Sequence, residues 1–365
     1  MRKATRYYSE RMQQTMESRT PIQADARLAS LHAWLATLPP ELGLLADTLR
    51  PASSDASFRR YFRIDRNGGT AIVMDAPPQH EDCAPFLHVG ERLRQAGLNV
   101  PEILAQDPAQ GFLLLSDLGT HTYFQAIREG LDDAALQRLY RPALHTLVRM
   151  QQAECGDLPR YDASRLIEEL SVFREWYVEG LCESQLTDRE TAMLGELFAV
   201  LTADNASQPT VLVHRDYHSP NLMLPLAEGG EPGVIDFQDA LAGPITYDIA
   251  SLVTDARTTW EEEQQLDWAI RYWEAARAAG LPVGSDFAEF HRAYEWMSLQ
   301  RNLRILGVFA RLSLRDGKHH YLDHLPRVNG YVRQVAGRYG LFRPLLRVLD
   351  RLDAATPGVG GQAGA

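Results

Sequence analysis

The sequence has very little lysine. Of its 37 basic residues only two, Lys3 and Lys318, are lysines, so the chain has none between residues 4 and 317. Any anion-binding site in that long stretch must therefore use arginine, a metal ion or backbone amides. The simplest explanation of the scarcity is a genomic bias toward arginine, which has no structural meaning of its own.

Cysteine and long apolar runs are also scarce. The three cysteines, Cys83, Cys155 and Cys182, are far apart in the sequence, which excludes a disulfide framework and a paired-cysteine zinc site. No run approaches the 18 apolar residues of a membrane span, and the first 20 residues lack the apolar core of a signal peptide. We therefore expect a cytoplasmic protein with no membrane partner.

The balance of charge excludes another class of partner. With 37 basic and 48 acidic residues the net charge is −11, and general binding of nucleic acid requires a basic surface. We expect no nucleic-acid partner. Net charge says little about a single pocket, however, so a local anion site remains open. The composition, with 45% hydrophobic and 23% charged residues, is that of an ordinary globular protein.

The periodicity of apolar residues divides the chain into a sheet-rich part and a helical part. The first part has a helix at Asp25–Leu38, a hairpin of Phe58–Asp65 with Thr70–Asp75, and a strand pair of Ile103–Gln106 with Gly111–Leu115. After Gly119 helical patterns dominate, over residues 121–129, 132–153, 163–180, 186–204 and 245–349. Short strands at 211–213, 222–224 and 233–235 interrupt them. This segregation predicts an α+β fold with two lobes.

The predicted domain boundaries follow from this division. Residues 1–22 are a disordered arm or an incorrectly assigned start, with Met16 as an alternative start. The sheet-rich lobe covers residues 23–118, and the helical lobe covers 119–353. Residues 354–365 form a disordered tail rich in small side chains.

Three residues of the short-strand region carry the strongest chemical signal. Asp216 and Asn221 lie five residues apart in HRDYHSPN between two apolar strands, and Asp236 follows in VIDFQD. Phosphoryl transfer needs a carboxylate that orients the attacking hydroxyl, and oxygen ligands that hold Mg²⁺ on the nucleotide phosphates. The three residues have the order and spacing of a kinase catalytic loop and metal loop. The alternative is that they are turn residues that only cap loops.

These motifs resemble the aminoglycoside phosphotransferase and choline kinase family, which shares the protein-kinase fold. The resemblance covers residues 28–349 and implies ATP and Mg²⁺ as cofactors. It implies that Asp216 is the catalytic base and that Asn221 and Asp236 bind the metal. It also implies that His214, His218 and Asp248 support the loop, although His218 is equally well explained as an interior histidine. Asp239 is either structural or in contact with substrate.

Further segments resemble one branch of this family, the bacterial kinases of cell-wall recycling. They are SSDASFRRYFRI, AIVMDAPP, EDCAPF, FLLLSDLG and LQRNLRILGVFARLSLRDGKHHYL. This resemblance implies phosphorylation of the small amino sugars N-acetylmuramate and N-acetylglucosamine at the anomeric hydroxyl. The product would pass to a sugar-1-phosphate nucleotidyltransferase, and the kinase is expected to be a monomer.

The nucleotide side of the predicted site departs from the protein-kinase pattern. It has neither a glycine-rich loop nor a strand lysine; Met74 or Asp75 stands where the lysine would be. Arg60 and Arg63 are candidates for the phosphates, although both are equally well explained as solvated strand residues. The other predicted nucleotide contacts are Ser57, in the loop from Ser53, and Leu115 and Asp117 of the hinge.

The expected sugar site lies on a late helix near Asp286–Leu314. Trp296, Gln300 and Arg304 recur every four residues and therefore share one face, while Leu299, Leu303 and Leu306 are predicted core residues. Arg304 is a candidate partner for the lactyl carboxylate of N-acetylmuramate, or else a helix-surface ion-pair residue. Two other functions remain open: another small-alcohol kinase, acting on an aminoglycoside or choline, and a pseudokinase.

Overall fold

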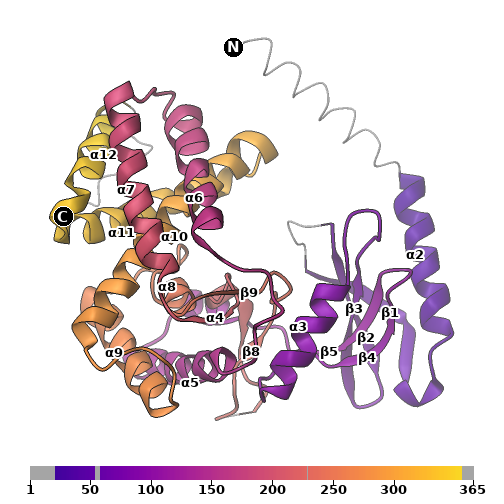
Figure 1. The fold of residues 1–365 in the computed structure, drawn as a ribbon. Coiled ribbons are helices and arrows are strands. Elements are labelled where there is room, and N and C mark those ends of the chain that lie inside the picture. Colours follow the sequence, from indigo (N-terminus) through magenta and orange to yellow (C-terminus); the bar gives the residue numbers. More distant parts are fainter. Residues whose placement is uncertain (1–20, 54–57, 228, 356–365) are drawn as a thin grey trace. The chain divides into compact units, whose positions relative to one another are not determined.

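The computed structural model describes residues 21–53, 58–227 and 229–355, which form two compact units (Figure 1). The first unit runs to Leu87 and includes Pro101–Asp117; the second contains His88–Val100 and the chain from Leu118 onward. The sequence predicted an unbroken lobe over residues 23–118. Residues 88–100 group with the second unit, and within that unit the Val234 amide donates to the Asn99 carbonyl at 2.8 Å. Apart from their inner ends, the predicted arm and tail lie outside the described residues.

The first unit is built on an antiparallel sheet with the strand order β1-β2-β3-β5-β4. The predicted hairpin is confirmed: β2 and β3 pair in register from Arg60↔Asp75 to Arg66↔Gly69. Gly68 between them has φ 82°, a conformation that favours glycine. The strands are β1 (Leu44–Ser53), β2 (Arg60–Arg66), β3 (Gly69–Asp75), β4 (Ile103–Asp107) and β5 (Phe112–Ser116).

Helix α2 (Pro21–Ala36) packs its apolar side on one face of this sheet (Figure 1). Its Trp34 ring lies 5.5 Å from the ring of Phe112 on β5. Side chains alternate between the faces of a strand, so every second residue of the central strands reaches this cluster. Its buried members are Leu31, Trp34, Leu35, Ile64, Ala71, Val73, Phe112 and Leu114.

The second unit is mainly helical, with two short antiparallel strand pairs, β6-β9 and β7-β8. Helix α3 begins in the first unit and ends in the second. The helices of eight or more residues are α3 (Ala84–Gln95), α5 (Asp133–Gln151), α6 (Ala163–Val172), α7 (Asp188–Ala206), α9 (Glu262–Ala278), α10 (Phe287–Asp316), α11 (Leu325–Arg338) and α12 (Arg343–Ala355). The shorter elements are α4 (Tyr123–Glu129), β6 (Thr210–Val213), β7 (Leu222–Met223), β8 (Gly233–Val234), β9 (Leu241–Pro244) and α8 (Tyr247–Val253).

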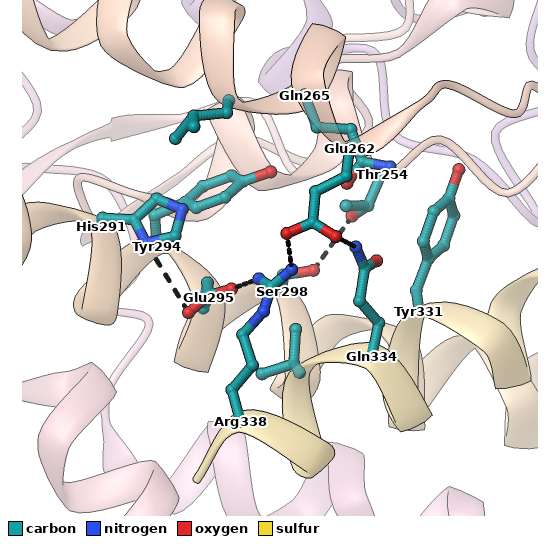
Figure 2. Close-up of a pocket in the computed structure, with 12 residues that line it drawn as sticks. Thr254, Glu262, Gln265, His291, Tyr294, Glu295, Ser298, Tyr331, Gln334 and Arg338 are labelled. Atoms are coloured by element: carbon teal, nitrogen blue, oxygen red, sulfur yellow. Dashed lines mark hydrogen bonds and ion pairs between the residues drawn. The ribbon is translucent and has the colours of Figure 1, made fainter.

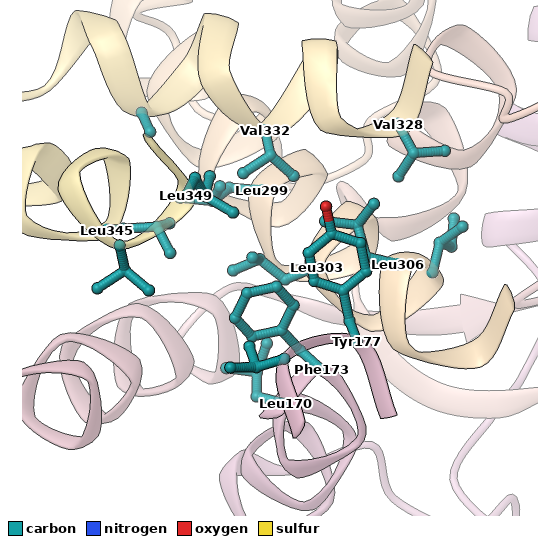
Figure 3. Close-up of a cluster of buried hydrophobic side chains, with 14 of the residues drawn as sticks. Leu170, Phe173, Tyr177, Leu299, Leu303, Leu306, Val328, Val332, Leu345 and Leu349 are labelled. Carbon is teal, nitrogen blue, oxygen red and sulfur yellow. The ribbon is translucent and has the colours of Figure 1, made fainter. Parts of the chain in front are cut away.

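Helix α10 runs through the main hydrophobic cluster of this unit (Figure 3). Leu299, Leu303 and Leu306 have no exposed surface, which confirms their predicted place in the core. The helix predicted over 163–180 divides into α6 and a π-helical turn, Phe173–Leu181, whose Phe173 and Tyr177 also enter the cluster. Among the described residues, no helix is both long and apolar enough to cross a membrane.

Candidate active site

The loop after β6 and the loop after β8 bring the three predicted catalytic and metal residues together. Asp216 follows β6, Asn221 ends the short 3-10 turn Ser219–Asn221, and Asp236 follows β8. Pairing of Leu222 with Val234 holds β7 against β8. The Ile235 amide donates to the Asn221 carbonyl at 3.1 Å, so the two loops are in register where their polar side chains project.

The Asn221 amide group joins the two aspartates. Its Nδ2 donates to the Asp216 carbonyl at 3.0 Å and lies 3.3 Å from Oδ2 of Asp236. Gln238 Nε2 donates to the other Asp236 oxygen at 2.8 Å. The structure thus places all three residues in one hydrogen-bonded cluster within the second unit, as their spacing predicted; their chemical roles stay predictions.

The backbone of both loops is strained beside these side chains. Arg215 has φ 77° and Asp236 has φ 66°, in the left-handed region that non-glycine residues rarely adopt. Such conformations persist only when surrounding contacts enforce them, and they concentrate at functional sites. For Arg215 the enforcing contact is Asp248, whose carboxylate accepts from the amides of His214 at 2.7 Å and of Arg215 at 3.0 Å.

Asp248 and His214 both form hydrogen bonds with the backbone of the two loops. Asp248 has no exposed surface, and burial raises its pKa to about 6. The His214 ring spans the two loops: Nε2 donates to the Ile235 carbonyl at 3.0 Å, and Nδ1 accepts from the Asp216 amide at 3.3 Å. That pattern requires a neutral imidazole with its proton on Nε2.

His218 is an interior histidine that also lies beside the candidate base. Its Nε2 is 3.8 Å from Oδ1 of Asp216, and within the described part of the chain its buried Nδ1 has no hydrogen-bond partner. Burial lowers the pKa of His218 to about 4, so the ring is neutral at pH 7. The structure thus shows an interior histidine, and its predicted support of the loop stays a prediction.

Two carboxylates that the sequence reading missed complete the support of the site. Buried Asp255 accepts from the Ser219 amide at 3.1 Å, from the Ser219 hydroxyl and from the Arg257 amide at 2.9 Å. Glu169 pairs with Arg215 at 3.1 Å and with Arg304 at 3.3 Å. Asp255 is 36 residues from Ser219, and Glu169 is 46 residues from Arg215, so no local pattern links them. An aspartate inside the apolar run IASLVTDA was the one available signal.

The Asp216 carboxylate is accessible and lies in a positive environment. Its side chain is 43% exposed. Lost hydration would raise its pKa, but Coulombic interactions with His218, Arg304 and Arg301 outweigh that effect and hold the pKa below its usual value. The carboxylate is therefore ionised at neutral pH and able to accept a proton.

The predicted sugar residues do not share one environment. Trp296 is corrected: it is only 8% exposed and packs in the core against Phe342, with ring centroids 5.1 Å apart. Gln300 is buried as well, and its Nε2 donates to the Leu166 carbonyl at 2.8 Å. Arg304 pairs with Glu169. Glu169 also pairs with Arg215, the residue that directly precedes Asp216. Asp239 is exposed in the turn between β8 and β9.

The predicted nucleotide contacts lie in the first unit, where both arginines are engaged in ion pairs. Arg60 Nε donates to Oδ2 of buried Asp75 at 2.8 Å, and Arg27 Nε donates to Oδ1 of the same carboxylate at 2.8 Å. Arg63 forms a two-point contact with Asp117, at 2.5 and 3.1 Å. Both arginines are thus paired with carboxylates, and their contact with nucleotide phosphates stays a prediction.

The structure says less about the other residues that were predicted to contact the nucleotide. Leu115 is 2% exposed in the middle of β5, between Ile72 of β3 and Ile103 of β4. The Asp117 carboxylate also accepts from the Thr70 hydroxyl at 2.6 Å, so it joins β3 to the segment after β5. Ser57 lies outside the described residues.

The donor set of Asn221 and Asp236 fits Mg²⁺. Magnesium prefers hard oxygen ligands and commonly takes only one or two carboxylates from the protein, with nucleotide phosphates and water completing its shell. Asp236 supplies a carboxylate and Asn221 an amide oxygen, 15 residues apart in sequence and joined in space. No cluster of three or more His, Cys, Asp or Glu that could bind a metal occurs among the described residues. The site thus fits a metal carried by a nucleotide.

A separate pocket of about 230 Å³ lies against α10 (Figure 2). Arg338 crosses it and pairs with both Glu262 and Glu295. Glu295 is also contacted by the Tyr339 hydroxyl and lies 3.7 Å from Nδ1 of His291. None of the predicted site residues lines this pocket, and its two carboxylates are already matched by their neighbours.

Comparison with known proteins bears on the family and the fold. The profile of the phosphotransferase enzyme family matches residues 48–296. The chain is 43% identical over 328 residues to the N-acetylmuramate/N-acetylglucosamine kinase of Neisseria meningitidis serogroup B, spanning 89% of this chain and 96% of that protein. It is 42% identical over 341 residues to a protein of the same name from Pseudomonas aeruginosa, spanning 91% and 98%.

The fold is shared more widely than the sequence. A choline/ethanolamine kinase family protein from Mesorhizobium loti superimposes with a TM-score of 0.58 at 14% identity, over 92% of this chain and 99% of that one. The predicted two-lobed α+β fold of the kinase type is confirmed. The chain therefore belongs to the phosphotransferase enzyme family.

Proposed function

We propose that this protein is an ATP-dependent kinase that phosphorylates the anomeric hydroxyl of N-acetylmuramate and N-acetylglucosamine. The cluster of Asp216, Asn221 and Asp236 carries the proposal that the protein transfers phosphoryl groups. The choice of sugar rests on the names of relatives that are 42–43% identical over about nine tenths of the chain. The reaction would take place in the cytoplasm and feed a sugar-1-phosphate nucleotidyltransferase.

In this proposal Asp216 orients the sugar hydroxyl and accepts its proton. Its carboxylate is exposed enough to meet a substrate, and its depressed pKa keeps it ionised. His214 and Asp248 fix the backbone on either side of it, so the carboxylate does not have to be ordered when substrate arrives. Neutral His218 adds no competing acid at pH 7.

Asn221 and Asp236 would hold Mg²⁺, which supplies positive charge to the nucleotide phosphates when bound. Gln238 and Asn221 each donate to one Asp236 oxygen, which fixes the orientation of that carboxylate. Arg215 and Arg304 add positive charge near Asp216 without any lysine. In the first unit, backbone amides remain the proposed phosphate donors, because Arg60 and Arg63 are held by Asp75 and Asp117.

A product assay tests the proposal. The protein is incubated with ATP, Mg²⁺ and one acceptor at a time: N-acetylmuramate, N-acetylglucosamine, choline, ethanolamine or an aminoglycoside. We expect ADP release with the two amino sugars and a ³¹P signal coupled to the anomeric proton. Release with choline or an aminoglycoside instead would identify another small-alcohol kinase, and nucleotide binding without turnover on any acceptor would identify a pseudokinase.

A further inference from the structure

Arg301 on α10 is a buried cation that makes no direct ion pair within the described chain. The residue is 4% exposed. Its Nε and Nη1 are buried and have no hydrogen-bond partner among the described residues, and no carboxylate there forms an ion pair with it. A buried guanidinium in this state is costly, because the hydration it has lost is not replaced. Such a group is retained most readily where an anionic ligand supplies the missing partner.

The neighbours of Arg301 place it beside the candidate base. Gln300 bonds to the Leu166 carbonyl of α6, and Asn302 bonds to Thr254, just after α8. One helical turn later Arg304 meets Glu169, which also holds Arg215, the residue before Asp216. The positive charge of Arg301 acts on the carboxyls of both Asp216 and Asp248. Arg301 therefore lies on the α10 side of the catalytic loop.

Arg304 and Arg301 differ in whether a carboxylate of the described chain pairs with their guanidinium group. Arg304 already has Glu169 as its carboxylate partner, 3.3 Å from its Nε. Arg301 has no such partner in the described structure, although it is the more deeply buried of the two. This contrast moves the expected contact with a substrate carboxylate from Arg304, where the sequence placed it, to Arg301.

We infer that Arg301 is the residue that recognises the lactyl carboxylate of N-acetylmuramate, and this inference rests on the proposed function. The two sugars named for the relatives differ by one lactyl ether, which carries a single carboxylate. An arginine fork that pairs with a carboxylate gains two parallel charge-assisted hydrogen bonds. Arg301 thus sets the preference between the charged sugar and the neutral one, while the catalytic cluster serves both.

Substrates matched in size but not in charge test this inference. We compare kcat/KM for N-acetylmuramate, its methyl ester and N-acetylglucosamine, in the wild type and in Arg301→Gln. We expect the wild type to prefer the free acid to its ester at least tenfold. Arg301→Gln should lose at least twentyfold on N-acetylmuramate and less than threefold on the two neutral sugars. On the free acid, the kcat/KM of Arg301→Lys should lie between those of the wild type and Arg301→Gln. An ammonium group keeps the positive charge but lacks the planar, two-point geometry of a guanidinium group.

The controls separate the possible failures. Arg315→Gln removes a half-exposed positive charge from the same helix and should leave all three rates unchanged. Equal losses on all three sugars would place Arg301 at the transferred phosphoryl group and overturn the inference, and so would unchanged rates. If Arg301→Gln does not fold, a wild type that uses acid and ester equally well overturns it. A wild type that phosphorylates neither sugar refutes the proposed function itself.

Discussion

At the scale of single residues, His218 couples the stability of the catalytic loop to pH. Burial lowers its pKa from 6.5 to about 4, so the folded protein favours the neutral ring. The stabilisation is complete above pH 6.5 and is lost as the pH falls toward 4. At about 1.4 kcal/mol per pKa unit the full effect is about 3 kcal/mol. We expect wild type to lose about that much stability relative to His218→Asn between pH 6.5 and 4, measured by urea unfolding.

Asp248→Asn is the matched control, because its effect has the opposite sign. Burial raises the pKa of Asp248 from 3.8 to about 6, so the folded protein favours the protonated acid, and stability is lost as the pH rises through this range. Relative to Asp248→Asn, wild type should therefore gain stability as the pH falls from 6 to 4. If both differences stay flat with pH, neither side chain is buried as described.

The predicted site residues that the structure brings together are those fixed by local spacing. One short loop holds Asp216 and Asn221, and the loop beside it holds Asp236. Pairing of β7 with β8 joins the two loops, so the separation of the three residues in the sequence already constrains their geometry. Glu169 and Asp255 reach the loop only through tertiary packing, and nothing in their own segments indicates a partner. Trp296 was misplaced because a helix buried on several sides has core residues outside the leucine face.

At the scale of elements, Gly307 lets α10 approach the end of α6 closely. A Cβ atom at this position would lie 2.3 Å from the Val172 carbonyl oxygen and 2.6 Å from the Phe173 amide nitrogen. Backbone atoms cannot move aside as a flexible side chain can, so α10 would have to shift. We expect Gly307→Ala to lower the free energy of unfolding by about 3 kcal/mol, measured by urea denaturation.

Gly195 on α7 offers the matched control for that substitution. It is exposed in the middle of a helix, and a Cβ atom there would meet nothing within 4 Å. Gly195→Ala should stabilise the protein by about 0.8 kcal/mol, because alanine is the better helix former. Equal effects of the two substitutions would contradict the close packing of α10 on Val172.

The elements that the sequence reading missed are those with poor local signals. β1 contains Pro51 and two irregularities in its pairing with β2, so its residues do not alternate cleanly. β9 reads LAGP, which has neither β-branched nor aromatic residues, yet it pairs with β6 over four positions. Long-range pairing, which a single sequence does not encode locally, decides both strands. The hairpin of β2 with β3 was predictable because its turn has residues that are typical of a β-hairpin.

At the scale of the whole molecule, the scarcity of lysine limits which groups can contact the phosphates of a nucleotide. The chain has only Lys3, which lies outside the described residues, and Lys318, which directly precedes the 3-10 turn His319–His324. The position expected for a strand lysine falls at Met74 or Asp75, where Asp75 is occupied by Arg27 and Arg60. We therefore expect charge on the nucleotide to be met without an ammonium group.

A lysine-free protein tests this statement directly. We expect the double variant Lys3→Arg/Lys318→Arg to retain kcat and the KM for ATP within twofold, measured by ADP release with N-acetylglucosamine. Its fold should be unchanged, because neither substitution alters a charge. A tenfold rise in the KM for ATP would mean that one of the two lysines reaches the phosphates after all.

Asp216 is proposed to act as the base of a sugar kinase, and the variant Asp216→Asn tests this role most directly. We expect kcat with N-acetylglucosamine to fall about 1000-fold, within the range for loss of a general base, while the KM for ATP stays within threefold. Asp267→Asn, which removes a surface carboxylate paired with Arg271 on α9, should have wild-type rates. An Asp216→Asn enzyme that keeps more than a tenth of the wild-type kcat would mean that Asp216 is not the base.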